Sequence, residues 1–102
     1  MGNYSSPTAK VHSDFSFLPP AFRFLRIPEV MKWRGVVRSM LYRQITAGIF
    51  PPPIKMGRAA LWPDFEVKLM NDACLRGDTI DELKALVLKL VSGRKTFGEV
   101  AA

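Results

Sequence analysis

Apolar residues recur with a helical period in the middle of the chain. Val37, Leu41 and Ile45 are spaced four residues apart, so they form one narrow apolar stripe on a short helix over about 37–47. The opposite face and its flank carry Arg38, Ser39, Tyr42, Arg43 and Thr46. Gly48 is placed to end this helix with a left-handed residue. The pattern predicts a helix with a buried stripe and a polar outer face.

A shorter helix is predicted just before it, in "RIPEVMKWRGVV". Pro28 suits the first turn, Glu29 favours the positive end of the helix dipole, and Gly35 ends the helix. We expect Trp33 to pack into the core, because a large apolar surface is more often buried than exposed. A short helix, a tight turn and a second helix with a polar face are typical of a helix-turn-helix.

The segment "IFPPPIKMGRAALW" cannot continue as helix, because its prolines fix an extended path. Phe50, just before the prolines, is expected to fill the core. "IKM" and "ALW" flank Gly57 and Arg58, which predicts a small β-hairpin with its tip at Gly57. A proline-rich recognition peptide is the alternative interpretation of the prolines.

Two further helices follow. "PDFEVKLMND" begins at Pro63 with Asp64 and Glu66 in its first turn, and "GDTIDELKALVLKLVSG" opens with Asp78 as N-cap and closes at Gly93. The second of these carries a broad apolar stripe of Ile80, Leu83, Val87, Leu90 and Val91, widened by Leu86 and Leu88. Exposed apolar surface of that breadth usually marks an interface, so we expect an oligomerisation surface there. Packing against its own domain is the alternative.

These elements predict a mainly α fold with a small β-hairpin, that is, a winged helix-turn-helix plus a C-terminal helix. Residues 1–22 lack a helical period and are rich in Ser and Pro, which indicates a flexible arm. The expected organisation is an arm over 1–22, the winged helix-turn-helix over 23–76, the C-terminal helix over 77–93 and a frayed tail over 94–102. A chain of 102 residues fits one such domain with appendages.

The distribution of charge along the chain indicates a function. The net charge is +6, and the window from Arg23 to Arg58 holds eight basic residues against Glu29 alone, a net +7. The rest of the chain holds seven basic and eight acidic residues, a net −1. A basic block of this kind favours a polyanionic partner, nucleic acid first and an anionic membrane second. A merely solvated basic face is the bland alternative.

The helix-turn-helix gives the basic window a chemical role. Its second helix enters the DNA major groove, where the residues of the first turns contact bases. Arginine bonds guanine in bidentate fashion, and Ser and Tyr hydroxyls suit phosphates or bases. A wing at the hairpin and the turn before the second helix suit the phosphate backbone. The predicted DNA-binding residues are Arg34, Arg38, Ser39, Tyr42, Arg43, Lys55 and Arg58.

Other chemistry finds little support in the sequence. No acid–base pair, phosphate-cradling glycine loop or activated nucleophile is recognisable, so we expect neither an enzyme nor a cofactor. His12 has no ligand cluster around it, and Cys74, alone, is expected to be semi-buried. "MGNYSS" matches a myristoylation pattern that is short and common by chance. Without a long apolar run or a secretory signal, a cytoplasmic location is expected.

Residues 25–70, "LRIPEVMKWRGVVRSMLYRQITAGIFPPPIKMGRAALWPDFEVKLM", resemble the AlpA family of phage- and mobile-element-encoded regulators, which is similar to excisionase and MerR-type winged helix-turn-helix proteins. The resemblance rests on "LRIPEV", Gly35, "RS", "YR", Gly48, "FP", Pro53, Lys55, "GR" and Trp62. Val37 departs from the capping Ser usual in the family, a loss of roughly 1 kcal/mol at the helix start. Met40 stands where Ser or Thr is usual.

The resemblance implies a DNA-binding protein of a bacterial mobile element, associated with the nucleoid. The expected role is that of an excisionase, or recombination directionality factor, which bends attachment-site DNA for an integrase. Its partners would be double-stranded DNA, further copies of itself in a cooperative oligomer, and a site-specific recombinase. A transcriptional regulator of prophage or integrase genes is the alternative. A protein-interaction adaptor with a basic face is a further one.

Overall fold

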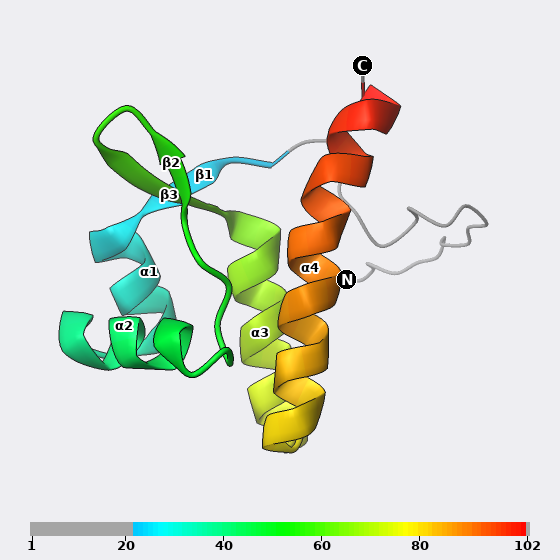
Figure 1. Ribbon diagram of the computed structural model, residues 1–102. Helices are drawn as coiled ribbons and strands as arrows, with labels where there is room; N and C mark the ends of the chain where they lie inside the picture. Colours follow the sequence, from blue (N-terminus) through cyan, green and yellow to red (C-terminus); the bar gives the residue numbers. More distant parts are fainter. Residues whose placement is uncertain (1–21, 102) are drawn as a thin grey trace, which may run out of the picture.

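The computed structural model describes residues 22–101, with side chains to residue 96. Its elements are β1 (Phe24–Arg26), α1 (Ile27–Arg34), α2 (Arg38–Thr46), β2 (Ile54–Met56), β3 (Ala59–Pro63), α3 (Asp64–Arg76) and α4 (Ile80–Ala101). Figure 1 shows α1, α2 and the sheet on one side of α3, with α4 along its other side. The predicted fold class, mainly helical with a small sheet and a C-terminal helix, is confirmed. The arm predicted for 1–22 lies outside the described residues, apart from Phe22.

The sheet has one more strand than the predicted hairpin. β3 lies in the middle, antiparallel to β2 on one side and to β1 on the other. The hairpin itself is confirmed, and Gly57 at its tip has a φ of +61°, which favours glycine. β1 was missed because three residues running straight into a helix are too short to show a strand's alternation.

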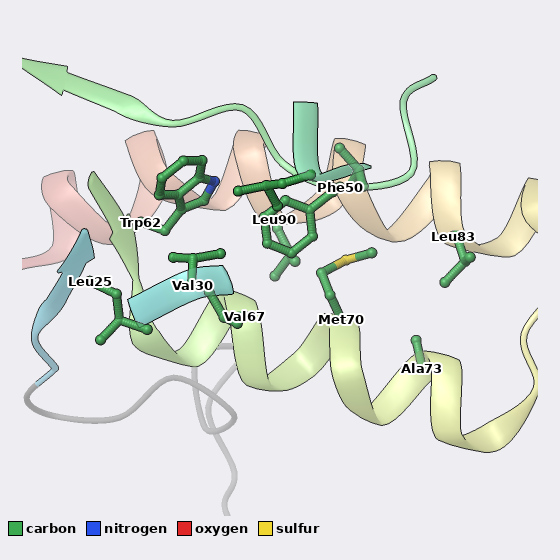
Figure 2. Packing of buried hydrophobic residues seen from close by; sticks show 11 residues of the cluster. Leu25, Val30, Phe50, Trp62, Val67, Met70, Ala73, Leu83 and Leu90 are labelled. Carbon is green, nitrogen blue, oxygen red and sulfur yellow. The ribbon is translucent and has the colours of Figure 1, made fainter. Parts of the chain in front are cut away.

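The core is built around Phe50 and Trp62, which are fully buried with tilted rings 6.3 Å apart (Figure 2). The Trp62 indole N–H donates to the carbonyl oxygen of Pro51 over 2.9 Å, so its polar atom is satisfied inside the core. Phe50 therefore fills the core as predicted. Pro51 is buried too, so the prolines form a connection within the fold rather than a free recognition peptide.

The two helices of the helix-turn-helix form close to the predicted ranges. Gly35 ends α1 with a φ of +67°, as predicted, and its N–H donates to the carbonyl oxygen of Met31 over 2.8 Å. The prediction that Trp33 packs into the core is wrong, because that side chain is 44 % exposed. Arg34, one turn after the buried Val30, takes the position that faces the neighbouring helices instead.

The predicted apolar stripe of α2 holds in part. Leu41 is fully buried and Ile45 packs against the core at its edge. Val37 is 65 % exposed, so the stripe is wrong at its first position. Val37 lies before the first helical turn with extended backbone, φ −85° and ψ 165°, and so leaves the helical face.

α4 begins with a different cap from the one predicted. The Glu82 N–H donates to Thr79 Oγ1 over 3.1 Å, and the Thr79 N–H donates to Glu82 Oε1 over 2.7 Å. This is a capping box, so Thr79 and not Asp78 is the N-cap. Asp78 accepts a hydrogen bond from Arg76 of α3 instead, over 3.0 Å.

Most of the apolar stripe of α4 packs back on its own domain, which was the alternative to the predicted oligomerisation surface. Leu83, Val87 and Leu90 are buried in the core, and Val91 packs against it. Figure 2 shows that core continuing through Val67, Met70 and Ala73. These α3 residues supply an apolar face long enough to cover the stripe. Ile80, at 54 %, and Leu88, which widens the stripe, at 70 %, stay exposed.

α4 continues beyond Gly93 to Ala101, so the predicted helix end at Gly93 is wrong, and residues 94–101 belong to the helix rather than to a frayed tail. A buried ion pair lies just after Gly93. The guanidinium of Arg94 donates from Nε and Nη2 to the two carboxylate oxygens of Glu66, over 2.8 Å and 2.7 Å. Its Nη2 also donates to the carbonyl oxygen of Pro52, over 2.8 Å. This contact fixes the last part of α4 to α3.

Candidate nucleic-acid interface

The outer face of α2 is exposed and polar, as predicted. The side chains of Arg38, Ser39, Tyr42 and Arg43 are all accessible to solvent. Leu41 anchors the opposite face in the core, which fixes the rotation of the helix. No acidic residue lies on α2, so the face is cationic and carries the hydroxyl groups of Ser39, Tyr42 and Thr46. Such a surface suits phosphates and base edges.

The hairpin brings its cations to the same end of the molecule. Lys55 on β2 and Arg58 beside the tip are exposed, and Lys55 lies opposite Ala60 in the sheet register. Arg38 and Arg58 line one shallow pocket of about 180 Å³, together with Arg26, Ile27, Pro28, Ala59 and Ala60. The start of α2 and the tip of the hairpin therefore each send an arginine to one hollow beside the start of α1. Both lie on the side of α3 away from α4 (Figure 1).

Arg34 does not belong to that outer face, which corrects its prediction as a phosphate contact. Its guanidinium donates to Asn71 Oδ1 over 2.8 Å and to Gln44 Oε1 over 2.9 Å. It also lies over the Phe50 ring, with 4.7 Å from Cζ to the ring centroid. Arg34 thus joins α1, α2 and α3, and sets the angle between the two helices of the motif.

Asn71 and Gln44 are functional supports that the sequence did not reveal. The Asn71 side chain accepts from Arg34 and donates from Nδ2 to the carbonyl oxygen of Trp33, over 3.0 Å. It thereby satisfies a backbone group at the end of α1. Gln44 holds the inner flank of α2 to the same guanidinium. Neither contact follows from spacing along one helix, because the partners are far apart in sequence.

One carboxylate lies close to the cationic face, and it is already engaged. Glu29 accepts from the Arg26 backbone N–H and from the Arg23 guanidinium, both over 3.2 Å. These two contacts lower the pKa of the Glu29 carboxyl, so it stays ionised and compensates Arg23. Within residues 22–96, no carboxylate oxygen lies within 4.0 Å of the cationic groups of Arg26, Arg38, Arg43, Lys55 or Arg58.

Some sequence predictions concern chemistry elsewhere in the chain. Cys74 is exposed rather than semi-buried, and Arg34 Nη1 approaches its sulfur at 3.8 Å. Over the part of the chain that the structure describes, no three His, Cys, Asp or Glu side chains gather as metal ligands would. In the same part, no helix combines the length and apolarity that crossing a bilayer requires. His12 and the "MGNYSS" segment lie outside the described residues.

A short helix, a glycine turn, a second helix with an exposed polar face and a β-hairpin beside it define a winged helix-turn-helix protein. The family model described as the prophage CP4-57 regulatory protein (AlpA) matches residues 23–69, which hold all of these elements. The uncharacterized protein ORF88 of Enterobacteria phage P4 is 39 % identical over 67 residues, covering 63 % of this chain and 76 % of the phage protein. No solved structure matches the chain.

The chain belongs to the AlpA family of phage-associated DNA-binding regulators. The matched region ends inside α3, so α4 lies beyond it. The family match therefore covers the helix-turn-helix and the hairpin, but says nothing about the element that completes the core.

Proposed function

We propose that the protein binds a specific double-stranded DNA site, with α2 in the major groove and the β2–β3 hairpin as a wing on the flanking backbone. The observation that carries this proposal is that Arg38 of α2 and Arg58 of the hairpin line one pocket, so both elements present cations to a common surface. The major groove is about 12 Å wide and admits one helix. A wing at that position then follows the backbone next to the groove.

The roles of the side chains follow from their places on α2. Ser39 and Arg43 lie on the face opposite the buried Leu41, so they point deepest into the groove and read bases. Tyr42 and Arg38 lie on one flank, nearer to the backbone. Lys55 and Arg58 on the hairpin contact phosphates.

The biological role we propose is regulation of genes of a mobile element, with DNA as the partner. A recombination directionality factor that bends attachment-site DNA for an integrase is the second candidate. Its support in the sequence was the α4 stripe as an interface between copies, and that stripe is buried in the core. The regulator is therefore the better supported of the two, and cooperative self-association and a recombinase partner stay predictions.

Gel-shift titrations on the DNA that flanks the gene, on the element's attachment site and on random duplex test this function. A specific binder prefers one natural site over random DNA and loses affinity steeply as the salt concentration rises. One complex at a promoter supports the regulator, and a ladder of complexes at the attachment site supports the directionality factor. Equal binding to every duplex, or no binding to any of them, contradicts the proposal. The remaining alternative is then a protein-interaction adaptor with a basic face.

A further inference from the structure

Three arginines from three separate elements line the pocket between the helix-turn-helix and the hairpin. Arg26 ends β1, Arg38 begins α2, and Arg58 stands at the hairpin tip. The remaining lining, Ile27, Pro28, Ala59 and Ala60, contributes no carboxylate. The fold fixes the backbone positions of two of them, because Arg26 lies opposite Leu61 in the sheet and Arg58 follows the tight turn at Gly57.

Three cationic side chains that line one shallow hollow repel one another, and an anion bound between them removes that repulsion. The nearest acid cannot be that anion, because Glu29 is bound by Arg23 and by the Arg26 backbone N–H. The start of α2 adds to the positive potential. Its N-cap, Val37, gives no side-chain hydrogen bond, and its first turn has no acidic residue.

We propose that this pocket binds one phosphate group of the DNA backbone, held jointly by Arg26, Arg38 and Arg58. A phosphodiester offers two charged oxygens that accept several N–H bonds at once, and arginine forks match that geometry. A pocket of about 180 Å³ has room for one such group. The inference rests on the proposed DNA-binding function and deepens it.

The proposal changes the role of two residues. Arg38 becomes a phosphate contact, so base reading falls to Ser39 and Arg43 further along α2. Arg26, which the sequence did not single out, becomes part of the interface. Because a single phosphate then touches β1, α2 and the hairpin, it fixes how deeply α2 enters the groove and in which register.

The test combines charge-neutral DNA with arginine variants. Single methylphosphonates are placed in turn along both strands of the bound site, and affinity is measured for the wild type and for Arg26→Ala, Arg38→Ala and Arg58→Ala. We expect one linkage at which neutralisation weakens the wild type about tenfold. At that linkage the same neutralisation costs each variant clearly less than it costs the wild type, because each variant has already lost part of the contact. If the loss of affinity from the arginine substitution and the loss from the methylphosphonate simply add at every linkage, the shared pocket is overturned.

The salt dependence gives a second readout. If the arginines serve one phosphate, the Arg26→Ala, Arg38→Ala, Arg58→Ala triple variant lowers the slope of log affinity against log salt by about one unit. Three separate phosphate contacts would lower it by nearly three. Lys95→Ala, which removes an exposed cation of α4 outside the pocket lining, is the control and leaves the effect of the key linkage unchanged. Thermal unfolding of each variant shows whether the fold is intact.

Inorganic phosphate separates this inference from the DNA-binding function. Added to the ¹⁵N-labelled protein without DNA, it is expected to shift backbone amide signals at residues 26–27, 38–39 and 58–60 in the wild type and not in Arg38→Ala. Saturable shifts with no DNA binding would support the pocket while contradicting the DNA function. The contrasting result is specific DNA binding with no phosphate-induced shifts and no linkage at which neutralisation is coupled to the three arginines. That result would overturn the pocket but not the DNA-binding function.

Discussion

At the scale of single residues, the start of α2 carries a position that is not optimised for stability. Val37 is the N-cap, has extended backbone and is largely exposed, yet its side chain offers no oxygen to the free N–H groups of the first turn. A serine there fits the same backbone and accepts one of those hydrogen bonds. The surface around it is open to solvent, so the substitution meets no packing constraint.

Val37→Ser is therefore expected to raise the free energy of unfolding by about 1 kcal/mol, measured by urea denaturation. Val37→Ala is the matched control, because it removes the same methyl groups without adding a hydroxyl. Equal stability of the serine and alanine variants would show that the hydroxyl does not cap the helix.

Arg43 is the residue on which sequence preference should depend most. It lies on the exposed face of α2, two positions past the buried Leu41. Arg43→Ala is expected to weaken binding to the natural site by about 1–3 kcal/mol and to relax base preference at one position. Competition binding against single-base variants of the site measures both effects. Lys55→Ala should weaken all duplexes alike, and the same uniform loss for Arg43→Ala would make Arg43 a phosphate contact.

The exposed positions of α2 were predictable because the helical period places every side chain relative to Leu41. The inward position of Arg34 was not predictable, although Arg34 lies in the same basic window. Its role depends on Gln44 and Asn71, which come to it from two other helices. Periodicity describes the faces of one helix and carries no information on which polar side chain of another helix meets them.

At the scale of elements, the helix-turn-helix and the hairpin followed from local signals. At the end of α1 and at the hairpin tip the backbone adopts a positive φ, which favours glycine, so both positions can be recognised in the sequence. The end of α4 did not follow, because Gly93 resembles a stop signal. In the structure Gly93 lies within the helix, where the contact of Arg94 with α3 holds the chain.

Gly93→Ala tests that α4 is continuous. A Cβ at Gly93 meets no atom within 4 Å, and alanine restricts the unfolded chain more than glycine does. The substitution is expected to raise the free energy of unfolding by about 0.5–1 kcal/mol. Gly35→Ala is the contrasting variant, since its φ of +67° disfavours a side chain and stability should fall. A destabilised Gly93→Ala in thermal unfolding would mean that the helix ends there.

At the scale of the whole molecule, α4 completes the hydrophobic core of the domain. Without it, α3 would expose the apolar face that Leu83, Val87 and Leu90 cover. The sequence showed the stripe but not its partner, because an apolar face on a helix is the same whether it meets its own chain or another copy. The deciding contact joins Glu66 and Arg94, which lie 28 positions apart and carry no recognisable motif.

Arg94→Ala is expected to reveal how strongly the molecule depends on that pair. Glu66 is fully buried, and burial raises the pKa of its carboxyl while the Arg94 guanidinium opposes that rise. Removing Arg94 leaves a buried, uncompensated carboxylate, at a cost of about 3–5 kcal/mol near pH 7. Lys68→Ala, which removes an exposed pair with Asp72, should change stability little.

The pH dependence separates this electrostatic cost from lost packing. In Arg94→Ala the pKa of Glu66 rises further above its unfolded value of about 4.3, so the folded protein binds the proton more tightly than the unfolded one. That contribution is fully present below the unfolded pKa and is lost as the pH rises through the folded pKa. The stability difference between Arg94→Ala and the wild type should therefore shrink as the pH falls from 7 towards 4, in urea titrations at each pH. Glu66→Gln added to Arg94→Ala should recover much of the stability at pH 7 and remove this pH dependence, whereas an equal loss at every pH would assign the effect to packing.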